Sequence, residues 1–163
     1  MPELNNQNFN HLKIHTQYSI CEGAIKIDNL KDFCKEKKIS SLGLSDTSNL
    51  CGALEFAENI SKVGTQPIIG TQIYFRFEDT TGLLPLIALN EKGYKRIIEL
   101  SSRSYLENDA LSDPHLDIKE LFSDTEGVSL LSGTIQGLFG KLFEKGRLED
   151  VTDIYRSLSS NFH

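Results

Sequence analysis

Sulfur-containing residues and long apolar runs are scarce in this 163-residue chain, which has one methionine and three cysteines. Cys21, Cys34 and Cys51 are odd in number and form no Cys-x-x-Cys pair, a usage typical of reduced thiols rather than of a disulfide framework. No apolar run is long enough to cross a bilayer. The polar segment MPELNNQNFN at the start contains no apolar stretch of the kind found in secretory signals. We therefore expect a cytoplasmic protein without membrane contact.

Positive charge is also in short supply. The chain has 17 Lys and Arg residues against 23 Asp and Glu residues, a formal net charge of -6. A surface of that sign does not attract nucleic acid as a whole, so direct contact with DNA needs a local basic patch. The hydrophobic content of 39% and the length are sufficient for one globular domain with a real core.

Apolar periodicity alternates between strand and helix along the chain. We expect a helix that begins after a cap at Ser48 or Asn49 and ends near Gly64. This alternation predicts an α/β fold with a largely parallel sheet. The predicted strands are 9–16, 41–46, 67–77, 83–89 and 127–133, and the other predicted helices are 28–38, 91–106, 117–122, 136–144 and 148–158.

The predicted helix over 91–106 has an apolar side and a cationic side. Its cations could meet phosphate, but a solvated helix face is the better interpretation. The expected buried residues are Tyr94, Ile97, Ile98, Leu100 and Tyr105, and the expected solvated cations are Lys92, Lys95, Arg96 and Arg103.

Functional side chains of α/β folds gather at the C-terminal ends of the strands. In HLKIHTQYS, the residues His11, Lys13 and His15 share one face of the first predicted strand. We interpret His11 as structural, and His15 as either a leftover metal ligand or, more commonly, a hydrogen-bonded interior histidine. Asp46, at the end of the second strand, is either a turn former or part of a polar pocket.

Five segments together resemble one known family. They are HLKIHTQYSICEGA, LGLSDTSNLCGALEF, QPIIGTQIY, LIALNEKGYKRIIELSSRSYL, and DIKELF followed by EGVSLLSG. Their order and spacing resemble the polymerase-and-histidinol-phosphatase (PHP) domain at the N-terminus of bacterial DNA polymerase III alpha subunits. The resemblance implies a distorted seven-stranded (β/α) barrel. We expect residues 1–8 to be a flexible N-terminus and residues 9–163 to be a PHP domain that stops before its barrel closes.

The resemblance also implies where metal ligands would stand. Metal-dependent members hold zinc-like ions with imidazole, carboxylate and thiolate groups, and these ions activate water for attack on a phosphoester. Only two strong donors remain here, so the resemblance implies a degenerate metal site with no catalytic residue and no cofactor of its own. The ligand positions carry Lys13, His15, Glu22, Thr47, Gln72, Leu83 and Thr134.

In place of the metal we predict a polar network in the pocket, made of Lys13, His15, Glu22 and Asp46. The Lys13 ammonium is expected to bond Asp46, Glu22 or both. Removing it with Lys13→Ala would then cost about 1–3 kcal/mol.

The function implied by the resemblance is that of a scaffold within a replicative DNA polymerase, which docks the proofreading exonuclease subunit. The whole alpha subunit would use Mg²⁺ and contact DNA through parts outside these residues. Two alternatives stay open: a metal-dependent phosphoesterase (a proofreading nuclease or a histidinol-phosphatase-like enzyme) and an interaction module unrelated to replication. Because an unclosed barrel exposes a sheet edge, we also expect self-association.

Overall fold

The chain folds around a six-stranded sheet. A computed structural model describes residues 9–109 and 111–162, so the expected flexible segment 1–8 lies outside the described residues. The strand order is β1-β2-β3-β4-β6, and β5 pairs with the far part of β3. The strands are β1 (His11–Ile14), β2 (Ser41–Thr47), β3 (Gln66–Phe77), β4 (Thr80–Ala88), β5 (Leu116–Asp117) and β6 (Val128–Leu130).

Strand direction divides the sheet into two parts. β1, β2 and β3 run parallel, whereas β4 is antiparallel to both β3 and β6. The α/β class is therefore confirmed, but the sheet is more mixed than expected, because Glu78 and Asp79 join β3 directly to β4. As expected for a barrel that stops before it closes, the six described strands form an open path with β1 and β6 as its edges.

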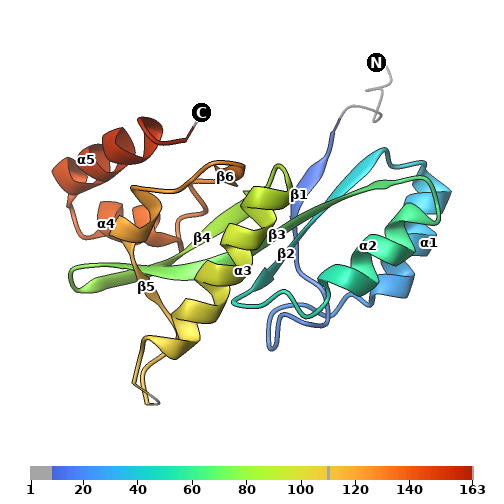
Figure 1. Cartoon of the computed structure of the whole chain (residues 1–163), viewed down its shortest axis with the longest axis horizontal. Coiled ribbons are helices and arrows are strands. Elements are labelled where there is room, and N and C mark those ends of the chain that lie inside the picture. Colours follow the sequence, from blue (N-terminus) through green and yellow to red (C-terminus); the bar gives the residue numbers. More distant parts are fainter. Residues whose placement is uncertain (1–8, 110, 163) are drawn as a thin grey trace.

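Helices cover the sheet at both ends and in the middle. α1 and α2 lie at one end, α4 and α5 lie at the other, and α3 crosses between them (Figure 1). None of the described helices is long and apolar enough to cross a membrane. The helices are α1 (Ile27–Lys37), α2 (Ala53–Ser61), α3 (Glu91–Leu106), α4 (Leu138–Glu144) and α5 (Leu148–Ser159), with a short 3₁₀ helix, η2 (Ile118–Leu121).

The apolar core forms two clusters. In the smaller one, α1 and α2 pack on β2, with Leu30 and Phe56 among the buried side chains. In the larger one, β3 and β4 pack with α3, α4 and α5 around residues such as Phe75 and Leu142. Leu50 packs against both clusters. The loops at the ends of β1 and β2 are thereby held over a rigid base.

The predicted cap of α2 is wrong. Gly52 occupies the N-cap position without any side-chain hydrogen bond. Asn49 Oδ1 accepts from Cys51 N at 3.0 Å in the turn before the helix, and Asn49 Nδ2 donates to the Tyr18 and Thr47 carbonyl oxygens, each at 2.9 Å. Asn49 therefore ties the loop after β1 to the end of β2, a contact that residue spacing along one helix does not reveal.

The predicted buried face of α3 is partly wrong. Ile97 and Leu100 are buried as expected, but Ile98 is 41% exposed and Tyr105 is 52% exposed. A Cβ added at Gly93 would lie 1.7 Å from the Gly127 carbonyl oxygen, so this glycine lets the helix approach β6 closely. Because of this approach, the side of α3 that carries Gly93 faces the protein interior, and Arg96 on that side is buried. Arg96 was expected to be solvated, but its guanidinium donates to the Glu120 carbonyl oxygen at 3.2 Å.

Candidate functional site

The implied ligand positions converge on one small pocket. A cavity of about 180 Å³ opens beside the ends of the parallel strands and is lined in part by Lys13, His15, Glu22, Gln72, Leu83 and Thr134. Its remaining wall comes from Pro85, Gly133, Gln136 and Gly137. The seventh position, Thr47, is hydrogen-bonded to two of the lining residues. The structure therefore brings together all seven positions that the sequence singled out.

Three of these residues form a hydrogen-bonded chain. Gln72 Nε2 donates to Thr47 Oγ1 at 2.6 Å, and Thr47 Oγ1 donates to the Glu22 carboxylate. Gln72 Nε2 also lies 3.5 Å from Glu22 Oε2. Thr47 and Gln72 are register partners on β2 and β3, whereas Glu22 belongs to the loop after β1. The chain thus connects three segments that are separate in the sequence.

Asp46 occupies a second, deeper cluster. Its carboxylate is fully buried and accepts three hydrogen bonds: from Thr16 N at 2.6 Å, from Thr16 Oγ1 at 2.7 Å and from Ser19 Oγ at 2.7 Å. Ser19 Oγ in turn accepts from Thr47 N at 3.0 Å. A buried carboxylate needs several donors of this kind to offset its desolvation.

Lys13 does not take the role predicted for it. It lines the pocket and is exposed, but no ion pair joins it to Asp46 or Glu22 among the described residues. The Asp46 carboxylate is fully buried and already accepts three hydrogen bonds from Thr16 and Ser19, so it is satisfied without an ammonium, whereas Glu22 bonds Thr47 through Oε2. In place of the predicted network of Lys13, His15, Glu22 and Asp46, the structure has two clusters that do not include Lys13 and that meet at Thr47. His15 contributes only a long contact, with Nδ1 at 3.5 Å from Ser19 Oγ.

The donor set does not fit the metal cluster that the resemblance implies. Lys13 is a cation and Leu83 has no donor atom, while Gln72 points an N–H group at Thr47. Within residues 9–109 and 111–162, no three His, Cys, Asp or Glu side chains lie together as possible metal ligands. Glu22 and His15 alone are too few for a multinuclear site. Loss of metal binding nevertheless remains a prediction, because only a binding measurement tests it.

Two site residues were missed from the sequence. Thr16 and Ser19 hold Asp46, yet the prediction from HLKIHTQYS rests only on the alternating His11, Lys13 and His15. The available signal was a threonine and a serine three residues apart in a polar turn, a spacing common where hydroxyls satisfy local backbone groups. That signal does not identify Asp46 as their partner, because the carboxylate lies 30 residues from Thr16 in the chain.

Sequence comparison places this chain beside one domain family. The family model described as PHP domain matches residues 11–163. DNA polymerase III subunit alpha of Caulobacter vibrioides is 34% identical over 100% of this chain and 15% of its own length. The same subunit of Borreliella burgdorferi is 35% identical over 88% of this chain and 13% of its own length. The chain therefore spans only about a seventh of these relatives.

Solved structures show only weak similarity. A proposed metal-dependent phosphoesterase from Bifidobacterium adolescentis has 14% identity and a TM-score of 0.45, and the match covers 91% of this chain and 55% of that chain. An amidohydrolase from Chromobacterium violaceum has 12% identity and a TM-score of 0.45, covering 90% of this chain and 54% of that chain. Similarity at this level contributes nothing to the functional argument.

Proposed function

The chain belongs to the PHP domain family and is homologous to the N-terminal region of DNA polymerase III alpha subunits, and on that premise we propose that it serves as a scaffold in bacterial DNA replication. In this proposal the old metal pocket is degenerate and stabilises the domain. The domain supports the remainder of the alpha subunit and docks the proofreading exonuclease subunit. Nucleotidyl transfer, Mg²⁺ and DNA contact belong to the rest of the polymerase, in the cytoplasm.

The composition of the pocket carries this proposal. Seven positions that would hold metal ligands lie together, yet they carry a lysine, a leucine, two threonines and a glutamine beside His15 and Glu22. Activation of water for phosphoester attack needs a Lewis acid held by strong donors. The donor chemistry here favours a structural role over a phosphoesterase.

A hydrolysis assay separates the scaffold from the phosphoesterase. We expect no cleavage of bis(p-nitrophenyl) phosphate or single-stranded DNA by the purified chain after addition of zinc or manganese. His15→Ala and Glu22→Gln are the matched controls for trace contamination, because they remove the two remaining strong donors. Cleavage that is sensitive to chelator and lost in both variants would establish the phosphoesterase and overturn the scaffold.

Docking is tested by binding. The chain is mixed with the exonuclease subunit of the same organism and followed by isothermal titration calorimetry and sedimentation. We expect a complex with one copy of each protein. Failure to bind, both for this chain and for the whole alpha subunit, would contradict docking. Binding by the whole subunit alone would assign the docking surface to another domain, which equally contradicts the proposal for this chain.

Self-association of the chain is a separate proposal. It rests on the two sheet edges, β1 and β6, whose outer backbone groups lack a neighbouring strand in the described sheet. Sedimentation velocity over a concentration series should show a fraction of dimer that rises with protein concentration. A monomer at all concentrations would contradict self-association and would leave the scaffold proposal unaffected.

A further inference from the structure

Glu22 reaches the pocket on a loop that crosses the end of the sheet. The loop leaves β1 at Thr16 and is closed by a bridge between Thr16 and Ile25, with Gln17 N donating to the Ile25 carbonyl oxygen at 2.9 Å. Within it, Glu22 N and Gly23 N both donate to the Ser19 carbonyl oxygen. These bonds shape the loop, and other bonds hold its first half to the end of β2: Ser19 bonds Asp46 and Thr47 N, and Asn49 bonds the Tyr18 carbonyl oxygen. The outer part, at Glu22, needs a connection of its own to β2 and β3.

That connection is made by the chain of hydrogen bonds from Gln72 through Thr47 to Glu22. Its proton order follows from the chemistry of the groups. The Gln72 Nε2 group can only donate, and it donates to the hydroxyl of Thr47. The single hydroxyl proton of Thr47 then points to Glu22, the one anion of the three. The donors therefore run in one direction and end on a negative charge, which strengthens such bonds.

We propose that Glu22, Thr47 and Gln72 form a metal-free lock, which fastens the loop between Thr16 and Ile25 to the ends of β2 and β3 and excludes divalent cations from the pocket. All three are positions where the resemblance implies metal ligands. The lock joins the same three segments by hydrogen bonds instead of by coordination. It does not depend on exonuclease docking.

Exclusion of cations follows from how the lone pairs are used. Thr47 Oγ1 accepts from Gln72 and donates to Glu22, so its hydroxyl is occupied on both sides. The Gln72 N–H group turns a partial positive charge toward the centre of the three residues, and Lys13 lines the same pocket. Within the lock itself, the described structure leaves Gln72 Oε1 as a buried acceptor without a partner. Beside this neutral oxygen the pocket offers only two strong donors, His15 and Glu22, which are too few to hold a metal cluster.

The lock is tested by a double-mutant cycle in urea. Gln72→Met removes one bond of the lock, from Gln72 to Thr47, and should lower the folding equilibrium constant about fivefold. Thr47→Val removes that bond and also the bond to Glu22, and should lower the constant about 25-fold. The double variant should match Thr47→Val alone, because the shared bond can be lost only once. A double variant at about 125-fold, the product of two independent losses, would overturn the lock.

Ser45→Ala is the matched control. Ser45 is fully buried on the same strand as Thr47, and its hydroxyl has no hydrogen-bond partner in the described structure. Its removal should change the equilibrium constant by less than about twofold. Thr47→Ser keeps the hydroxyl and should behave as the wild type in the exchange measurement below.

Amide hydrogen exchange tests whether the loop is the segment that is fastened. In Thr47→Val, exchange at Glu22 and Gly23 should rise about fivefold more than exchange in α3, because the outer part of the loop loses its tether in addition to the loss of global stability. Should Thr47→Val fail to fold, Glu22→Ala breaks the bond between Thr47 and the loop from the other side and gives the same readout at Gly23. Unchanged exchange at the loop would overturn the lock.

Cation exclusion is tested by unfolding the wild-type chain in excess zinc chloride and in EDTA. The lock predicts the same urea midpoint in both, since a ligand that does not bind the folded state cannot stabilise it. A higher midpoint in zinc would overturn this part of the proposal. None of these measurements involves the exonuclease, so their outcome is independent of the docking experiment.

Discussion

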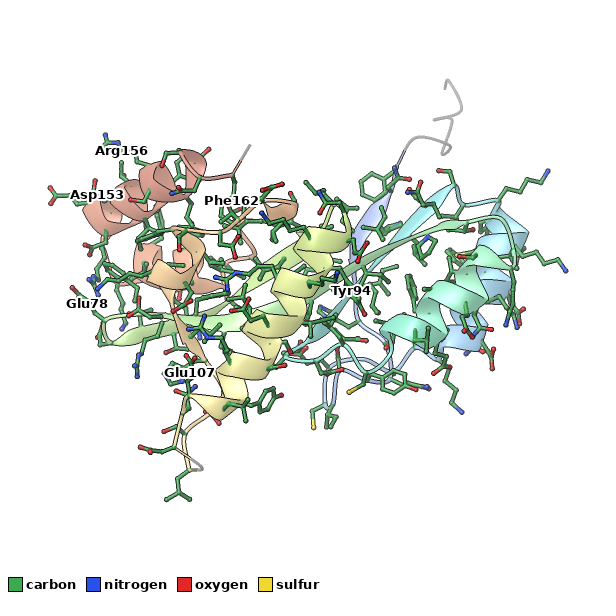
Figure 2. The ribbon with its side chains drawn as sticks, viewed as in Figure 1. Glu78, Tyr94, Glu107, Asp153, Arg156 and Phe162 are labelled. Atoms are coloured by element: carbon green, nitrogen blue, oxygen red, sulfur yellow. The ribbon has the colours of Figure 1, made fainter. Side chains whose placement is uncertain are left out.

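Two polar clusters solve the same electrostatic problem in different ways. Asp46 is fully buried and is satisfied only by neutral donors from Thr16 and Ser19. On the outer side of α3, Arg103 is paired with carboxylates: it makes two bonds to Glu107 and two to Glu120, at 2.6 to 3.1 Å. Glu107 lies at the C-terminal end of α3, on the surface (Figure 2).

The difference shows that burial, and not formal charge, decides what each cluster contributes. Water screens Arg103 and its partners, so most of their attraction is lost to solvent. The Asp46 carboxylate has no such screening, and each of its donors is needed. A buried carboxylate held by neutral donors can therefore matter more to stability than a network of ion pairs at the surface.

The largest effect is expected at Asp46. Asp46→Ala leaves the Thr16 amide and two hydroxyls without their acceptor inside the protein, so we expect a loss of about 3 kcal/mol in the free energy of unfolding. Asp46→Asn keeps the shape and one acceptor oxygen and should lose less. Urea denaturation measures both. Equal, small losses would mean that the cluster is more open to water than the structure indicates.

A smaller effect is expected at Arg103, which is 28% exposed. Because its bonds to Glu107 and Glu120 are paired forks, Arg103→Ala should cost about 1 kcal/mol, the upper range for pairs in contact with solvent. Arg156→Ala is the matched control, since Arg156 and Asp153 are both about three-quarters exposed and lie on the outer face of α5 (Figure 2). A loss at Arg103 as large as that at Asp46 would break the comparison.

Acid should remove part of the Arg103 contribution. The hydrogen bond from Arg103 lowers the pKa of Glu107 below its ordinary value of 4.5. A carboxyl whose pKa is lower in the folded state stabilises the fold above its unfolded pKa and loses that contribution as pH falls through the folded pKa. The difference between wild type and Arg103→Ala should thus be constant near neutral pH and shrink below about pH 4.5. A difference that grows with acid would contradict the assignment.

Local pattern predicted the elements well because each depends on nearby residues. The helix over 91–106 has the bounds that were predicted, and β3 differs by one residue. The pattern failed where a distant backbone decides the outcome. Ile98 faces outward because Gly93 lets α3 approach Gly127, and neither glycine belongs to the apolar pattern.

The sequence predicted which residues lie around the site but not which of them form hydrogen bonds with one another. The resemblance selected the seven residues around the pocket, since strand ends meet wherever the topology is kept. The choice among partners was not predictable, because several donors compete for two carboxylates and only their three-dimensional placement decides. Two hydroxyls donate to Asp46 and one donates to Glu22, and Lys13 forms no ion pair with either carboxylate in the described structure.

The smallest effect is expected at Lys13, where the sequence predicted a substantial one. Its side chain is exposed, and both carboxylates that it was expected to reach accept other donors. Lys13→Ala should therefore change the free energy of unfolding by less than about 0.5 kcal/mol, as for other surface positions without partners. The change should not vary between pH 5 and pH 8, because no carboxylate depends on the ammonium.

Lys13→His sharpens the same point. It restores an imidazole beside His15, yet Thr47, Gln72, Leu83 and Thr134 still supply no strong donor. We expect no zinc-dependent rise in the urea midpoint of this variant. If Lys13→Ala instead cost 1 kcal/mol or more, the lysine would pair with a pocket carboxylate in solution. The polar residues around the pocket would then depend on an ion pair, as the Arg103 network does, and the contrast between the buried and the exposed cluster would fail.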